Sequence, residues 1–215
     1  MARVYFVRHG ESEANLLRVF SNRDANHGLT PTGRAQVKHL AERLADVPFA
    51  AFYCSPVLRA RQSADILSDR LGVAYVVSSA LTEYDVGILE GRSDEVSWKH
   101  YWRVREAWQV RGEYDARVEG GESFNDVRSR FLPLIEELRA RPAEDHVLLL
   151  GHGGTYACML PLVLSNVDQL FALDHALGHT EAIIAELSLE KMTCLSWGPI
   201  QLDTTSPSPS GRGLG

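Results

Sequence analysis

The sequence predicts an α/β fold: a three-layer α/β/α sandwich with a mostly parallel central sheet and a small helical cap over the strand ends. Short apolar runs of strand length alternate with amphipathic segments that begin with helix-capping residues. This alternation favours a sheet covered by helices on both faces. The 215 residues, 45% of them hydrophobic, suffice for one sizeable core. We therefore expect one domain over 1–198, with its cap at about 92–119, and a disordered Ser/Pro/Gly tail at 199–215.

The expected strands are short apolar runs that end at glycine or at other turn residues. The first of them, RVYFV, is too short for a helix and is followed closely by a glycine. In chain order the runs lie at 3–7, 49–54, 73–77, within 146–154, at 182–187 and at 192–196.

Three amphipathic segments are expected to form helices, because each follows a capping residue and carries apolar side chains at helical spacing. Gly72 suits the position just past the second helix. Pro133 should kink the third helix or begin a new one, since proline removes an N–H and crowds the preceding turn. The caps are Thr30, Ser55 and Ser123, and proline follows the first two directly.

The segment 97–114 is expected to form the cap helix, and it holds three of the four tryptophans of the chain. Its aromatic stripe is more typical of packing against the body than of ligand binding. A second interpretation is an aromatic wall for an organic leaving group, with Arg103 or Arg111 meeting a second anionic group. The residues on one face of this helix are Trp98, Tyr101, Trp102, Arg105 and Trp108.

The segment RHGES places Arg8 and His9 at the end of the first predicted strand. Side chains at the carboxyl end of such a strand face the crevice where ligands bind in open α/β sheets. Histidine is a nitrogen nucleophile near neutral pH, and a guanidinium fork fits phosphate oxygens. The pair indicates phosphoryl transfer through the histidine.

Two further strand ends carry side chains of the same kind. His152 ends the apolar run HVLLLG, and Gly153 follows it with a reachable backbone N–H. Arg59 lies in the first turn of the helix expected after the strand at 49–54. We expect these groups to meet at one edge of the sheet.

A phosphatase also needs an acid, because a phosphoester leaving group otherwise departs as an alkoxide. The segment LTEYDVGILEG offers Glu83, Asp85 and Glu90. Spacing alone does not choose among the three.

Six motifs in this order resemble the histidine phosphatase superfamily, which includes the phosphoglycerate mutases. They are RHGES, LTPTGRAQ, SPVLRARQSA, LTEYDVGILEG, GGES and GHGG, and the resemblance extends from Arg3 to about Trp197. It implies that His9 is the phosphorylated nucleophile and that Arg8, Arg59 and His152 bind the phosphoryl oxygens. It also implies that Glu83 is the proton donor.

The resemblance extends more weakly to the rim of the expected pocket. Asn15 and Ser21 match positions that line the phosphate or substrate side in this family. The chain departs from the common pattern nearby, because His27 and Gly28 stand where many members have an acidic residue and a proline.

The expected function is hydrolysis of a small phosphorylated metabolite through a phosphohistidine, without a metal or another cofactor. A cofactor-dependent phosphoglycerate mutase is the alternative from the same family. Mutases typically have an Arg-His-Tyr run after the acid, whereas this chain has Tyr84, Asp85 and Val86. A non-catalytic module that binds a phosphorylated ligand is the alternative from another class, and the intact His9, Glu83 and His152 argue against it.

Composition narrows the partners and the compartment. The 22 basic and 28 acidic side chains give a net charge of −6, which argues against nucleic acid or an anionic membrane. We expect a small-molecule phosphate ester as the partner, with a homodimer left open. A cytoplasmic location is expected, because no secretory signal is visible and three cysteines without metal spacing are typical of reduced core thiols. They are Cys54, Cys158 and Cys194.

Overall fold

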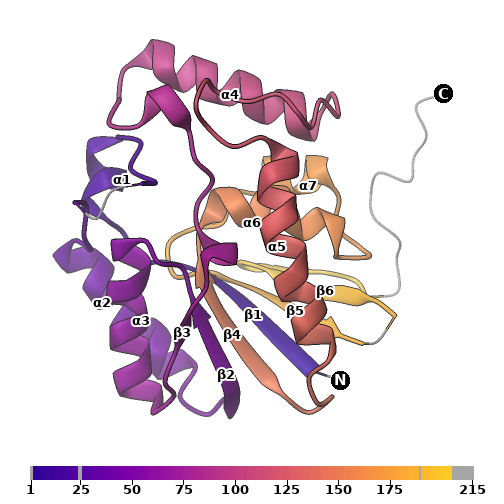
Figure 1. Cartoon of the computed structure of the whole chain (residues 1–215). Coiled ribbons are helices and arrows are strands. Elements are labelled where there is room, and N and C mark those ends of the chain that lie inside the picture. The colour runs from indigo at the N-terminus through magenta and orange to yellow at the C-terminus, as the bar shows by residue number, and fades with distance from the viewer. Residues whose placement is uncertain (1, 24–25, 189, 205–215) are drawn as a thin grey trace.

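The computed structural model describes residues 2–23, 26–188 and 190–204, in which seven strands form one sheet between layers of helices (Figure 1). This confirms the predicted three-layer α/β/α sandwich. The sheet order is β3-β2-β4-β1-β5-β6-β7. The strands are β1 (Ala2–Arg8), β2 (Phe49–Cys54), β3 (Val76–Val77), β4 (His146–Gly151), β5 (Ala182–Leu187), β6 (Met192–Trp197) and β7 (Ile200–Gln201).

The sheet is mixed rather than mostly parallel. Strands β3, β2, β4 and β1 pair in parallel, whereas β1, β5, β6 and β7 pair antiparallel. The connection from β5 to β6 is too short for a crossover helix, so these strands form a hairpin. The parallel half supplies the strand ends that carry the predicted site.

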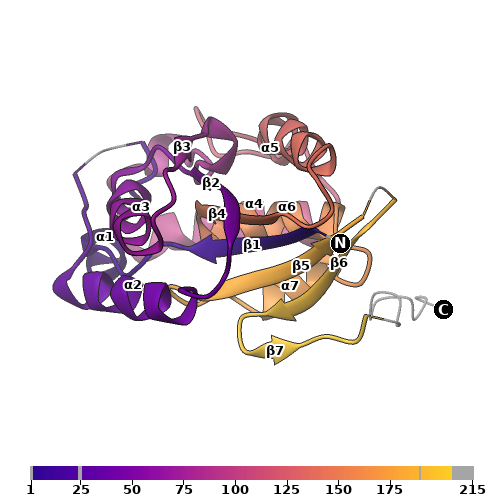
Figure 2. The ribbon, with the colours of Figure 1, turned by 90° about the horizontal axis from the view of Figure 1, so that it is seen from below.

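The helices divide between the two faces of the sheet, as Figure 2 shows for α2 and α5. Alternate side chains of β1 therefore enter different cores. Tyr5 and Val7 pack with α2 and α3, whereas Val4 and Phe6 pack with α5 and α6. The helices are α1 (Glu13–Leu17), α2 (Pro31–Arg43), α3 (Leu58–Leu71), α4 (Glu95–Gln109), α5 (Phe124–Arg139), α6 (Gly153–Met159) and α7 (Gln169–Asp174), with 3-10 turns at Ser79–Leu81, Gly87–Leu89 and Leu160–Leu162.

Two of the three predicted helix starts are correct and one is wrong. Thr30 and Ser123 cap α2 and α5 through their hydroxyls. Helix α3 instead begins at Leu58 with Val57 as its N-cap. The hydroxyl of Ser55 accepts from the N–H of Val57 at 3.3 Å and from His152 at 2.8 Å, so it joins the turn before the helix to the site.

Helix α5 continues through Pro133 instead of ending there. Pro133 lies on the exposed side of the helix, so water can satisfy the carbonyl that loses its donor. Of the two expected outcomes, a kink or a new helix, the new helix does not form.

Three other segments refine the predicted pattern. Strand β3 is only two residues long, and β7 lies within the segment expected to be a tail. The rest of that expected tail, 205–215, lies outside the described residues. Helix α4 covers the carboxyl ends of the parallel strands, where the cap was expected (Figure 1).

The three cysteines are free and buried, as expected of core thiols. None of the described helices is both long and apolar enough to cross a membrane.

The register between β1 and β4 brings the two motif histidines together. Arg8 pairs with Gly151, and the backbone N–H of His9 donates to the Gly151 carbonyl at 3.1 Å. His9 and His152 therefore leave adjacent parallel strands at the same level. The loop after β1 then packs on the first turn of α2.

That packing depends on two glycines, because they place no side chain between the backbone of the loop and the backbone of α2. A Cβ on Gly33 would lie 2.0 Å from the carbonyl oxygen of Glu11, and a Cβ on Gly10 would lie 2.6 Å from the Gly33 oxygen. The backbone that follows His9 is thus seated directly against α2.

We predict that Gly33→Ala destabilises the protein, although alanine ordinarily favours a helix. Overpacking against a backbone oxygen should cost about 3 kcal/mol, which corresponds to a melting temperature lower by roughly 6–12 °C. The matched control is Gly72→Ala, where φ is +68° and no atom lies within 4 Å of the added Cβ. That change should cost only about 1 kcal/mol. The measurement is the thermal unfolding of both variants. A higher melting temperature for Gly33→Ala than for Gly72→Ala would contradict this packing.

Candidate active site

His9 and His152 lie together in the interior, with ring centroids 5.0 Å apart. Both side chains are almost completely buried. Their pKa values lie well below the usual histidine range, chiefly because burial penalises the charged ring and secondly because of the Arg59 charge. Both rings are therefore neutral near pH 7.

The hydrogen bonds of His9 define which nitrogen carries the proton. Its Nδ1 lies 2.7 Å from the carbonyl oxygen of Gly10, and the Nε of Arg59 donates to its Nε2 at 2.9 Å. A carbonyl only accepts and a guanidinium only donates. The proton is therefore on Nδ1, and Nε2 keeps its lone pair.

The first turn of α3 positions Arg59, whose guanidinium joins several parts of the site. Its Nη1 donates to the carbonyl of Ser21 at 2.5 Å, and its Nη2 lies 3.3 Å from the Nδ1 of His152. Burial lowers the pKa of Arg59 to about 10, so it remains charged at neutral pH. Its partners are all neutral.

Arg8, at the end of β1, supplies a second cation. Its Nη1 donates to the carbonyl of Leu177 at 2.6 Å, and its Nη2 lies 3.1 Å from the Nε2 of His179. None of the ion pairs between described residues includes Arg8 or Arg59. Two cations without a paired carboxylate make this part of the site attractive to anions.

His152 lies behind the cavity wall rather than on it. Its Nδ1 accepts from Arg59, so its Nε2 carries the proton and donates to the hydroxyl of Ser55 at 2.8 Å. The expectation that His152 lies beside His9 is thus met, but it reaches the cavity through Arg59.

Glu83 comes from the loop after the turn Ser79–Leu81 and meets the start of α6. Its carboxylate accepts from the N–H of Gly154 at 3.0 Å, from the hydroxyl of Thr155 at 2.9 Å and from the N–H of Tyr84 at 3.1 Å. Glu83 lines the same cavity as His9.

The two other acidic candidates do not line that cavity. Asp85 pairs with Arg23 at 2.7 Å and accepts from the N–H of Gly87. Glu90 accepts from the backbone N–H groups of Asn22 and Arg23. Both carboxylates hold loops, so Glu83 is the one of the three candidates that lines the cavity with His9.

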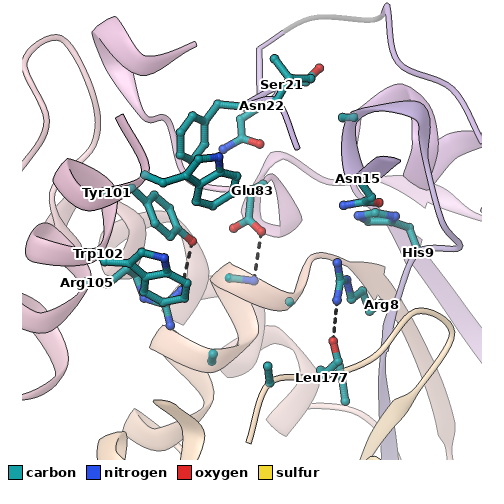
Figure 3. A pocket seen from close by; sticks show the side chains of 18 of the residues that line it. Arg8, His9, Asn15, Ser21, Asn22, Glu83, Tyr101, Trp102, Arg105 and Leu177 are labelled. Carbon is teal, nitrogen blue, oxygen red and sulfur yellow. Dashed lines mark hydrogen bonds between the residues drawn. The ribbon is translucent and has the colours of Figure 1, made fainter. Parts of the chain in front are cut away.

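The cavity has a volume of about 350 Å³ and lies between the strand ends and the cap. Arg8, His9 and Glu83 lie around it, as Figure 3 shows. Asn15, Ser21 and Gly153 also line it, where the sequence placed them. The side chain of Asn15 accepts from Ser12, and the hydroxyl of Ser21 lies 2.8 Å from the Nδ1 of His27.

The cap side of the cavity is aromatic, and the sequence pattern was partly right about it. Trp108 is 1% exposed and belongs to the core, whereas Trp102 is 51% exposed and lines the cavity. Neither Arg103 nor Arg111 lines it. Arg103 is exposed, and Arg111 pairs with two glutamates of the cap, so both expectations are wrong. The cavity-lining residues of α4 are Trp98, Tyr101, Trp102 and Arg105.

Sequence reasoning missed three residues that contact the site. His179 neighbours Arg8, and Asn22 accepts from Arg59 at 3.4 Å. Thr155 follows the second motif glycine and donates to Glu83. Only Thr155 had a signal, since it directly follows GHGG. Among the residues described, no three His, Cys, Asp or Glu side chains gather as ligands for a metal ion.

Comparison with known proteins identifies relatives of this chain. A probable phosphoglycerate mutase of Photorhabdus laumondii is 30% identical over 166 residues, which are 76% of this chain and 75% of that protein. A probable phosphoglycerate mutase of Escherichia coli is 28% identical over 170 residues, with the same coverage.

Solved structures share the fold at lower identity. A mycobacterial glucosyl-3-phosphoglycerate phosphatase in complex with VO3 has a TM-score of 0.78 at 22% identity, covering 91% of this chain and 98% of that one. A putative alpha-ribazole-5'-P phosphatase from Escherichia coli has a TM-score of 0.75 at 20% identity, covering 92% and 97%.

The model of the histidine phosphatase superfamily (branch 1) matches residues 4–199, which include both histidines, both arginines and Glu83. The chain therefore belongs to the histidine phosphatase superfamily.

Proposed function

We propose that this protein is a phosphomonoesterase that hydrolyses a small phosphorylated metabolite through a phosphohistidine on His9. One observation carries the proposal: His9 is neutral, its unprotonated Nε2 accepts a hydrogen bond from Arg59, and the cavity beside it contains Arg8 and Glu83. A nucleophile, a binding site for an anion and an acid thus share one cavity.

In the first step the Nε2 of His9 attacks phosphorus and the bond to the ester oxygen breaks. Glu83, protonated in the substrate complex, gives its proton to the departing oxygen. Positive charge develops on the imidazole as the N–P bond forms. The Gly10 carbonyl, which accepts a hydrogen bond from the Nδ1–H with an N···O distance of 2.7 Å, stabilises that charge.

In the second step water attacks the phosphohistidine in line and the N–P bond breaks. Glu83, now a carboxylate, takes a proton from that water, which restores the protonated acid and the neutral ring. The sum of the two steps is an alcohol and inorganic phosphate from an ester and water.

The cations around His9 bind the transferring phosphoryl group. Arg8 and Arg59 offer forked donors to its equatorial oxygens, and they are held in place before substrate arrives. His152 holds the Arg59 guanidinium in place, because its Nδ1 accepts from the Nη2 of Arg59 at 3.3 Å. No metal or other cofactor is part of this mechanism.

Hydrolysis is favoured over the mutase reaction by the loop after Glu83. Mutases of this family typically have basic residues after the acid, whereas this chain has Tyr84, Asp85 and Val86, and Asp85 is paired with Arg23 outside the cavity. The named relatives include probable phosphoglycerate mutases, and the structural neighbours are phosphatases of two different substrates.

Incubation with p-nitrophenyl phosphate separates an enzyme, which releases nitrophenol, from a module that binds without turnover.

We predict that His9→Ala abolishes hydrolysis, with a loss on the order of 10⁶-fold as for other removed nucleophiles. Substrate carrying radioactive phosphate should label the wild type in an acid-labile form and should leave this variant unlabelled. His39→Ala, on the exposed surface of α2, should retain both turnover and labelling. Substantial turnover by His9→Ala would disprove the mechanism.

We predict that the effect of Glu83→Gln depends on the leaving group. Alkyl phosphates need a protonated leaving oxygen, so their hydrolysis should fall by about 10²- to 10⁴-fold. A nitrophenyl ester needs little protonation, so its first step should suffer far less and phosphohistidine should accumulate. A burst measurement with the nitrophenyl ester, beside steady-state assays on an alkyl ester, reads both effects.

The control for that experiment is Asp85→Asn, because Asp85 pairs with Arg23 outside the cavity. It should show no dependence on the leaving group. If Asp85→Asn showed the dependence and Glu83→Gln behaved like the wild type, the wrong acid would have been assigned.

A further inference from the structure

We propose that Thr155 is a positioning residue for the acid of this site, and that its hydroxyl changes acceptor as the reaction proceeds. The hydroxyl donates to the carbonyl of Thr82 while Glu83 is protonated, and to the Oε1 of Glu83 once that proton has left. This inference rests on the proposed function, since it adds a residue to the same reaction. It explains how one carboxyl group is held while it acts first as an acid and then as a base.

The hydroxyl of Thr155 faces the loop that carries the acid. Thr155 belongs to the first turn of α6 and is completely buried. Among the described residues, both hydrogen-bond partners of its hydroxyl come from the loop after the turn Ser79–Leu81, and they are more than 70 positions away in the chain. Its Oγ1 lies 2.9 Å from the carbonyl oxygen of Thr82 and 2.9 Å from the Oε1 of Glu83. The contact is therefore part of the site and not a helix cap.

This hydroxyl has one proton and two acceptors for it. A carbonyl oxygen accepts hydrogen bonds and cannot donate, and the same is true of an ionised carboxylate. The two acceptors lie at the same distance, so the charge on Glu83 decides between them. A hydrogen bond to an ionised group is roughly twice as strong as one between neutral groups. The carboxylate therefore takes the proton of the hydroxyl bond, and a protonated carboxyl gives it back to the Thr82 carbonyl.

The other contacts of Glu83 indicate which of its oxygens exchanges a proton with the substrate. Besides Thr155, its Oε1 accepts from the N–H of Tyr84 at 3.1 Å. Its Oε2 has one partner among the described residues, the N–H of Gly154 at 3.0 Å (Figure 3). A carboxylate oxygen has room for two hydrogen bonds, so the open position is on Oε2. Thr155 thus holds the oxygen that does not exchange the proton, and it acts on the reaction through Glu83.

Gly154 fixes the carboxyl group where Thr155 can reach it. A Cβ on Gly154 would lie 2.7 Å from the Oε1 of Glu83 and 2.8 Å from its Oε2. The carboxyl group therefore rests directly on the backbone of α6, one residue before Thr155.

The two steps of the reaction depend on the Thr155 hydroxyl in opposite ways. In the first step Glu83 becomes a carboxylate, and the hydroxyl stabilises the charge that forms. In the second step the carboxylate takes a proton from water, and the same bond stabilises the state before the transfer. Loss of the hydroxyl should therefore make Glu83 a weaker acid and a stronger base. Formation of the phosphohistidine should become slower, and its breakdown should not.

The test compares Thr155→Val, which keeps the shape of the side chain, with Thr155→Ser, which keeps the hydroxyl. The substrates are phenyl phosphates with an acidic nitrophenol or a weakly acidic methoxyphenol as leaving group. In Thr155→Val, kcat/KM for the methoxyphenyl ester should fall by about 3- to 10-fold, a part of the effect of a charged hydrogen bond. The nitrophenyl ester needs little protonation and should be nearly unaffected. Thr155→Ser should match the wild type for both esters.

Breakdown of the phosphohistidine is measured separately, by labelling with radioactive nitrophenyl phosphate and then adding an excess of unlabelled ester. Thr155→Val should lose its label at least as fast as the wild type, whereas Glu83→Gln should retain it. The matched control is Thr193→Val, because Thr193 is a buried threonine of β6 whose hydroxyl contacts Ser165. It should change neither step. Thr155→Cys, whose thiol is a weak donor, replaces the valine variant if that variant does not fold, and it should show the same pattern.

Infrared spectroscopy of the free protein separates this inference from the proposed function. The carboxylate band of Glu83, identified by its absence in Glu83→Gln, is measured at a pH where this group is ionised. It should shift in Thr155→Val and not in Thr155→Ser. If the wild type forms and hydrolyses a phosphohistidine, but Thr155→Val leaves the band in place, slows both esters equally or slows the breakdown, the role of Thr155 is disproved and the phosphatase stands. If the band shifts as expected and the wild type hydrolyses no ester, the hydrogen bond to the carboxylate stands and the phosphatase is disproved.

Discussion

The contact between the Arg59 guanidinium and the Nε2 of His9 is the interaction on which the rest of the site depends. The same side chain reaches His152 and the carbonyl of Ser21, so it joins both strand ends to the loop after α1. Burial and, secondly, its charge keep both rings neutral, and none of the ion pairs between described residues includes Arg59. An incoming phosphate supplies the opposite charge, so binding and activation of the nucleophile have one physical origin.

The scaffold makes this arrangement possible by rigid backbone contacts. The β1–β4 register aligns the two histidine positions, and Gly33 lets the loop after His9 rest on α2. Buried unpaired cations destabilise a fold, and here the two apolar cores on either side of the sheet offset that cost. The unpaired buried charges of the site thus lower the stability of an otherwise well-packed protein, which is typical of sites built for charged ligands.

Local patterns predicted the strands, two of the three helix caps and the grouping of Arg8, His9, Arg59 and His152. They failed where tertiary contacts decide the outcome. Ser55 has the local signature of a cap, but the helix begins at Leu58, and the Ser55 hydroxyl also accepts from His152, which follows β4. Arg105 was placed on the correct face of its helix, but the second interpretation of the cap named Arg103 and Arg111, because periodicity does not show which cap side chains reach the cavity. His179 lies in a loop without any pattern.

The protonation state of His9 in the free, full-length protein tests the central claim most directly. Nitrogen-15 NMR of the histidine side chains between about pH 6 and 8 reads both charge and tautomer, and the spectrum of His9→Ala identifies the signal. We expect a neutral ring with its proton on Nδ1 throughout this range, because burial and the Arg59 charge lower the pKa of His9. A cationic ring at neutral pH, or a proton on Nε2, would contradict the account.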